Sequence, residues 1–89
     1  MTQEDRIQTA YDAVPEHVRD DICEAVVWAK DTLMKLEGEG HLFYITGTKE
    51  GKVCCSFAKP EWSGDHCGRP MEYGAPAVVM AVCEYLEGA

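Results

Sequence analysis

The chain has 89 residues, of which 46% are apolar, and this length and composition indicate one small globular domain. Sixteen acidic residues against eight basic ones give a formal net charge of −8, which disfavours binding to nucleic acid or to an anionic membrane. No apolar run approaches the ~20 residues that span a bilayer. The acidic start of the chain is the opposite of a signal peptide, so we expect a cytoplasmic protein.

The first part of the chain predicts two helices. Thr2 with Asp5 three residues later is a capping pattern, and apolar residues then recur at helical spacing up to Val14. Pro15 ends this helix and opens a second one. We expect the second helix to run without interruption from Pro15 to residue 37 and to end at Gly38.

The apolar period then changes from 3.6 to 2. Residues 41–46 and 52–57 are rich in aromatic and β-branched side chains, and a glycine-containing turn separates them. This pattern predicts a β-hairpin, which must pack on the helices because two strands alone are marginally stable. Residues 59–74, which hold three glycines and two prolines, are expected to form one long irregular loop.

A last helix is expected from Ala75 to Glu87. Its middle, residues 77–83, contains no polar side chain, and a helix that is apolar all round is buried all round. One small chain offers little with which to cover every side, so we expect a homo-oligomer, in the simplest case a dimer, formed through this helix. The expected fold is a single α+β domain in the order α-α-β-β-α, with the hairpin packed on the long second helix and on the last helix.

Carboxylates four residues apart form a ladder on the second helix: Glu16, Asp20 and Glu24, resumed at Asp31. Like charges at this spacing destabilise an isolated helix by roughly 0.2–0.5 kcal/mol per pair. The ladder is therefore either solvated surface or a surface that meets a basic partner. Trp28 has polar neighbours on the helix and is a candidate apolar anchor for such a partner, unless a loop of the chain covers it.

A second candidate site would bind a small anion such as a nucleotide. The start of the last helix offers free backbone N–H groups, and Arg69 precedes it. Trp62 or Tyr73 could stack on a base. The alternative function is thus an oligomeric protein that binds or sequesters nucleotides, although the chain has no glycine-rich phosphate-binding motif.

Five cysteines raise the question of zinc or thiol chemistry. Cys54 and Cys55 are adjacent on a strand and point to opposite faces, so a zinc site is a lesser alternative. A nucleophile at Cys67 would need a base from elsewhere in the fold, because the preceding His66 is poorly placed for that role. We therefore expect no enzyme, no cofactor and no metal site.

In size, acidity and lack of catalytic motifs, the chain resembles the small acidic inhibitors encoded by bacteriophages, of which anti-CRISPR proteins are the best-known kind. The resemblance covers the whole chain and assigns no role to any residue. It implies a partner that handles nucleic acid and has a basic channel to be blocked. Together with the ladder, it predicts a protein that occludes a basic surface of a macromolecular partner.

Overall fold

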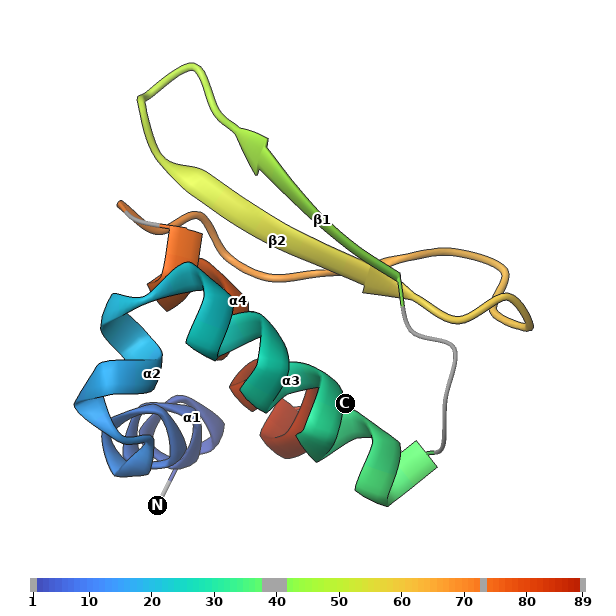
Figure 1. Cartoon of the computed structure of the whole chain (residues 1–89), viewed down its shortest axis with the longest axis horizontal. Coiled ribbons are helices and arrows are strands. Elements are labelled where there is room, and N and C mark those ends of the chain that lie inside the picture. The colour runs from blue at the N-terminus through green and yellow to red at the C-terminus, as the bar shows by residue number, and fades with distance from the viewer. Residues whose placement is uncertain (1, 38–41, 73, 89) are drawn as a thin grey trace.

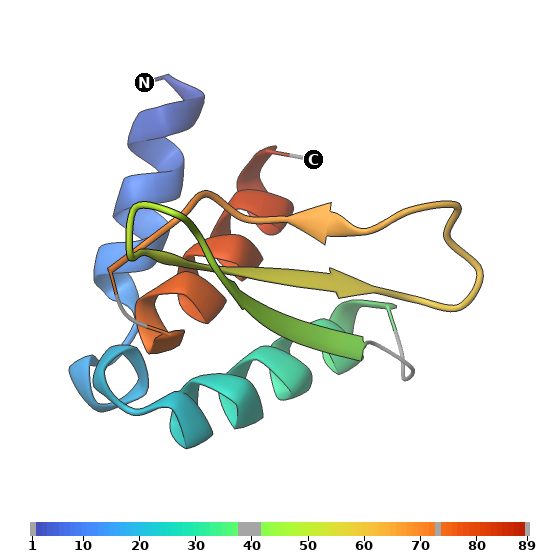
Figure 2. The ribbon, with the colours of Figure 1, turned by 90° about the horizontal axis from the view of Figure 1, so that it is seen from above.

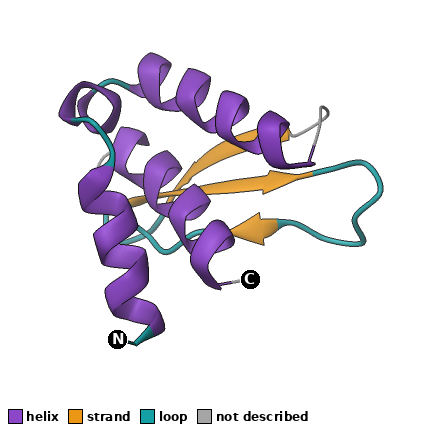
Figure 3. Ribbon diagram, turned by 90° about the horizontal axis from the view of Figure 1, so that it is seen from below, coloured by secondary structure: helices purple, strands orange, loops and turns teal. Residues whose placement is uncertain are grey.

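The computed structural model describes residues 2–37, 42–72 and 74–88. Within these ranges the elements are α1 (Gln3–Ala13), α2 (Glu16–Asp20), α3 (Ile22–Glu37), β1 (Leu42–Gly47), β2 (Val53–Ala58), β3 (His66–Cys67) and α4 (Gly74–Gly88). The strands form one antiparallel sheet in the order β1-β2-β3. The helices lie on one side of this sheet (Figures 1 and 3). The predicted α+β class is confirmed.

Helix α1 begins with the expected capping box. The backbone N–H of Asp5 donates to Thr2 Oγ1 at 3.2 Å, and the N–H of Thr2 donates to the Asp5 carboxylate at the same distance. Ile7 and Val14 are buried against the rest of the chain. Pro15 follows the helix, so both of its ends lie where the sequence predicts them.

The predicted second helix is in fact two helices. Asp21 has extended backbone angles, φ −124° and ψ 120°, and it separates α2 from α3. Its Oδ1 atom accepts hydrogen bonds from the backbone N–H groups of Cys23 at 2.8 Å and Glu24 at 3.3 Å. These bonds satisfy two N–H groups of the first turn, which have no partner within the helix. The prediction of one uninterrupted helix from Pro15 to residue 37 is therefore wrong at Asp21. The end predicted at Gly38 lies outside the described residues.

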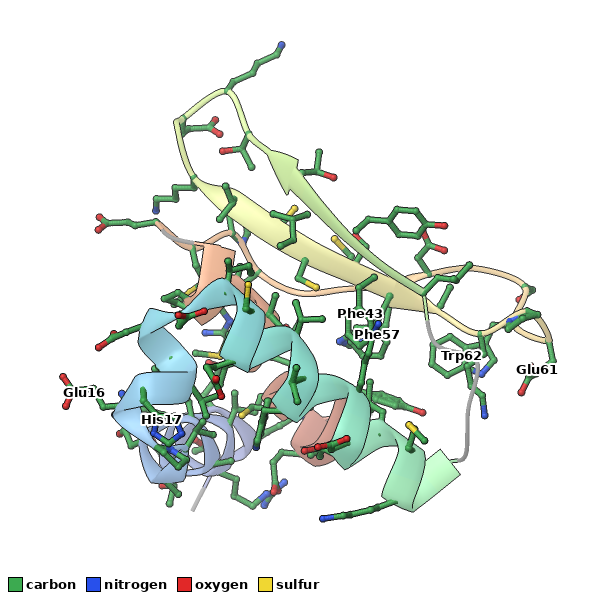
Figure 4. All side chains as sticks on the ribbon, viewed as in Figure 1. Glu16, His17, Phe43, Phe57, Glu61 and Trp62 are labelled. Carbon is green, nitrogen blue, oxygen red and sulfur yellow. The ribbon has the colours of Figure 1, made fainter. Side chains whose placement is uncertain are left out.

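The predicted hairpin is confirmed. Three of its four strand ends lie within one residue of the prediction, and the fourth, residue 41, lies outside the described residues. β1 pairs with β2 in the register Phe43 opposite Phe57. Gly51 in the turn has φ +79°, a left-handed angle that glycine adopts without steric cost. Phe43 and Phe57 both point from the sheet towards the helices, with ring centres 5.7 Å apart (Figure 4).

The long segment after β2 is more ordered than predicted. His66 and Cys67 form β3, which pairs with β2, and Met71 exchanges two backbone hydrogen bonds of 2.6 Å with Val53. The expectation of one irregular loop over residues 59–74 is therefore wrong. Two residues are too few to show a strand period, so this pairing leaves little trace in the sequence.

Helix α4 is the centre of the fold. It packs against α1, α2, α3, β2 and β3, and residues 77–83 are 0–3% exposed. One chain therefore does cover the apolar helix on all sides, contrary to our expectation. The reason given for a dimer through this helix is removed, because its apolar middle has no free face.

We expect Asp21→Ala to lower the free energy of unfolding by about 1 kcal/mol, the usual cost of losing an N-cap side chain. Asp20→Ala is the matched control, because Asp20 is exposed and makes no capping bond in the described part of the chain. Urea unfolding of both variants measures the difference. Equal stabilities would show that the Asp21 carboxylate does not stabilise the start of α3.

We expect Gly68→Ala to destabilise the protein by about 1–3 kcal/mol, the usual cost of overpacking. A Cβ on Gly68 would lie 2.6 Å from the Cβ and 2.8 Å from the Cα of Ala81 on α4, so β3 and α4 would have to separate. At Gly64, a Cβ would meet no described atom within 4 Å. Gly64→Ala should therefore unfold at nearly the wild-type urea concentration. Equal losses from the two substitutions would contradict the close approach.

Candidate functional site

The four ladder carboxylates are all exposed, but they do not share one helical face. Glu16 and Asp20 lie on α2, whereas Glu24 and Asp31 lie on α3 beyond the break at Asp21. Figure 4 shows Glu16 pointing outwards from α2. Within residues 2–37, 42–72 and 74–88, no ion pair engages any of the four. The acidic surface therefore extends over both helices, and no ion pair between described residues neutralises these four carboxylates.

Trp28 is half-buried and packs against the core. At about 100° per residue, it lies about 40° from Glu24 and 60° from Asp31 around α3. The exposed part of the Trp28 side chain is therefore on the same side of α3 as Glu24 and Asp31. A tryptophan that is fixed by the core and partly exposed has the character of a binding anchor.

The anion site expected from the sequence is not assembled as predicted. The Arg69 guanidinium donates to Glu84 on α4 and lies 3.1 Å from Glu4 on α1. The hydrogen bond to Glu84, and to a smaller extent the one to Glu4, raises the pKa of Arg69 above its ordinary value. Glu84 is ten residues from Gly74, so Arg69 is held about 15 Å along α4 from the helix start. Two carboxylates already neutralise the cation that was expected to attract the anion.

The two aromatic residues of that predicted site do not join Arg69. Trp62 lies 5.7 Å from Tyr85 and 6.2 Å from Phe57, measured between ring centres, in an aromatic cluster against the core. The 590 Å³ hollow beside Arg69 does not include Trp62 in its lining. Tyr73 lies outside the described residues. Among the described residues, Arg69 and Trp62 are therefore not brought together at the start of α4.

His66 and Cys67 point to opposite faces of the sheet. The His66 ring lies 4.9 Å from the Phe57 ring on the inner face, with Nε2 3.2 Å from the carbonyl oxygen of Ala81. Cys67 is exposed. Its neighbouring imidazole is therefore directed away from it and is held by the core. No cluster of three or more metal-ligating side chains occurs within the described ranges.

A groove beside the hairpin was not predictable from any pattern in the sequence. This hollow of 480 Å³ is lined by Val26, Lys30, Leu42, Phe43, Ile45 and Val78. It lies between α3 and β1, with α4 contributing Val78. Its residues come from three elements, and each has an ordinary structural explanation in the sequence. Only the tertiary arrangement shows that the α3 and β1 residues of this lining are left partly uncovered, whereas Val78 is fully buried.

The comparisons with known proteins do not place the chain in a family. No family model, no curated protein and no solved structure matches it. In the part of the chain that the structure describes, none of the helices has the length and apolar character needed to cross a membrane.

Buried thiols predict a pH dependence of stability. Burial raises the pKa of Cys55 and of Cys83 to about 11, from the ordinary thiol value of 9.0. The unfolded chain then releases these protons at lower pH than the folded chain does. The two protonated thiols therefore contribute fully to the free energy of unfolding below pH 9, and this contribution is lost as the pH rises towards 11.

We therefore expect the urea midpoint, measured under reducing conditions, to fall between pH 8.5 and pH 10.5. The fall should be smaller in Cys55→Ala and in Cys83→Ala, whatever their stability at pH 7. Cys23→Ala is the control, because Cys23 is exposed, and it should keep the wild-type slope. If all the variants follow the wild-type slope, these thiols do not cause the pH dependence.

Proposed function

We propose that this chain is a binding protein that occludes a basic surface of a macromolecular partner, as small acidic phage-encoded inhibitors do. The observation that carries the proposal is the set of exposed carboxylates on α2 and α3, none of which is neutralised within the described residues. An acidic surface of this kind steers a basic partner into contact and raises the association rate. The basic surface is expected to be a nucleic-acid-binding one.

The break at Asp21 spreads the carboxylates over two helices, so they can contact a broad basic surface on the partner. Two helices that meet at an angle present their carboxylates over a corner, and a single straight helix would present them along a line (Figure 1). Duplex DNA carries a charge every ~1.7 Å, whereas one helical stripe carries one about every 6 Å. The acidic surface is therefore too sparse to copy a nucleic-acid backbone. It suits a plug that covers a basic groove.

We expect the variant with Glu16, Asp20, Glu24 and Asp31 all changed to lysine to lose the partner. Immobilised wild-type protein should retain a discrete complex from host lysate at low salt and release it at high salt. Charge steering of this kind commonly changes association rates 10- to 1,000-fold, and salt screens it. Thermal unfolding of the variant should stay close to that of the wild type, because all four side chains are exposed.

The matched control changes Asp12, Glu50, Asp65 and Glu72 to lysine. These side chains are also exposed, and each set of four replacements takes the formal net charge from −8 to zero. Retention of the complex by the control and its loss from the first variant would support the proposal. Equal loss from both would show that only net charge matters, and equal retention would remove the ladder from the interface.

A further inference from the structure

Exposed apolar side chains gather on two neighbouring elements. In the described part of the chain, seven large apolar residues are exposed, and five of them lie on α3 or line the groove from β1: Ile22, Val27, Met34, Leu42 and Ile45. A sixth, Tyr44 of β1, points to the opposite face of the sheet and does not belong to this group. Val27 is 58% exposed and Leu42 55%. Isolated exposed apolar residues need no explanation, but a group of them on adjacent elements is typical of an interaction surface.

β1 is an edge strand, and its outer hydrogen-bonding groups are identifiable. The N–H of Thr48 donates to the carbonyl of Lys52, so residues 48 and 52 form a hydrogen-bonded pair of the hairpin. Such pairs alternate along an antiparallel ladder. The backbone groups of Phe43 and Ile45 therefore point away from β2. Within the described ranges no other strand pairs with them, and β1 contains neither lysine nor proline to protect the edge.

The groove lies directly beside this open edge. Phe43 and Ile45 belong to the inner face of the sheet and line the 480 Å³ hollow together with Val26 of α3. Ile45 is 45% exposed although it faces the helices. Figure 2 shows α3 lying along and beyond the free side of β1. A strand added to β1 would therefore place every second side chain over the apolar groove.

The groove and a neighbouring hollow differ in the charged residues that line them. Lys30 lines one part of the groove. A second hollow of 400 Å³ at the start of α4 is lined by Asp20, Ile22 and Arg19. The Arg19 Nε donates to the carbonyl of Val14 and the guanidinium lies over the Tyr11 ring, whereas Asp20 is exposed. Ile22 and Ile45, one from each hollow, both reach the space beside Gly74, at 3.4 Å and 3.9 Å from where a Cβ would stand. An extended segment that follows β1 towards this end would bring its next side chains to the exposed carboxylate of Asp20.

A second copy of the chain is a poor occupant of this edge. Antiparallel pairing of two β1 strands requires a two-fold axis perpendicular to the sheet, which puts both α3 helices on the same side. Because α3 extends beyond β1, the two helices would compete for the same space (Figure 2). Each copy also carries a net charge of −8, so the approach is repulsive. A single extended segment meets neither obstacle.

We propose that the open edge of β1 and the groove beside α3 bind an extended segment of a partner protein as a fourth strand. The segment has apolar side chains at alternate positions, which enter the groove, and a basic side chain at the end that reaches Asp20. Strand addition of this kind takes its affinity from main-chain hydrogen bonds and its sequence preference from the pockets beside the strand. It deepens the proposed binding function and rests on it for the basic character of the partner.

The test uses a phage-displayed library of random 10-residue peptides selected on the whole protein. We expect the selected peptides to alternate apolar residues and to carry lysine or arginine at one end. A synthetic peptide of the consensus should slow amide hydrogen exchange at Phe43 and Ile45, the groups that face the open edge. Peptides without this pattern, or protection confined to other elements, would overturn the proposal, as would a selection that enriches no peptide.

The decisive variant is Ile45→Pro, which removes an outward N–H and leaves the bonds between β1 and β2 in place. We expect peptide binding to weaken about tenfold or more. Ile45→Ala keeps the N–H and should bind more tightly than the proline variant. Tyr44→Ala is the control: Tyr44 is 51% exposed, and its register partner Ser56 places it on the opposite face of the sheet, so binding should be unchanged. Hydrogen exchange of the β2 amides confirms that each variant keeps its sheet.

The outcomes separate this site from the proposed function. If the peptide binds at β1 and Asp20→Lys does not weaken it, strand addition stands and the basic partner is contradicted. If the lysate partner depends on the carboxylates and is retained by Ile45→Pro, the proposed function stands and strand addition is overturned. Sedimentation of the protein alone is the last check: a dimer that Ile45→Pro dissolves would assign the edge to a second copy and overturn the peptide site.

Discussion

Burial of α4 is the constraint on which the rest of this structure depends. Residues 77–83 carry no polar side chain, so every face of the helix must be covered by other parts of an 89-residue chain. Full burial of a valine or methionine side chain stabilises the fold by about 1.5–3 kcal/mol. The break at Asp21 serves this burial, because it lets α2 and α3 take different directions and still both contact α4. Gly68 serves it too, because without a side chain β3 can approach Ala81 closely.

The same constraint explains why one edge of the molecule is incompletely covered. The sheet packs on α4 through β2 and β3, and β1 lies at the edge of the sheet, next to β2. α3 is held against α4 by Ala25, Ala29 and Leu33, which are fully buried, so it cannot also seal the inner face of β1. Ile45 is left partly exposed for this reason. The groove is thus a consequence of how few elements are available to a domain of this size.

The sequence predicts those features of the fold that depend on short-range chemistry. The Thr2 capping box, the two hairpin strands and the helix around residues 77–83 all follow from local patterns, and the structure contains them. The break at Asp21 has a local signal, since Glu24 follows it at capping-box spacing, but the carboxylate ladder hides that signal. Coverage of α4 and the pairing of β3 depend on contacts between distant residues, so no local pattern contains them.

The candidate sites divide in the same way. Exposure of the ladder carboxylates follows from their charge and was predictable. The capture of Arg69 by Glu4 and Glu84 was not, because those residues are 65 and 15 positions away in the chain. The groove has no sequence signal at all. Phe43 and Ile45 read as ordinary inward-facing strand residues, and only the position of α3 decides how much of them remains exposed.

An unprotected edge strand and a strongly acidic surface are each unfavourable when considered alone. The first invites pairing with other chains, and the second has no neutralising partners among the described residues. In this protein the acidic charge reduces the risk that the open edge of β1 creates. Repulsion between two copies that each carry −8 opposes edge-to-edge association, so the charge protects a strand that has no lysine or proline of its own. The same charge attracts a chain that brings positive residues, and such a chain can then reach the open backbone of β1.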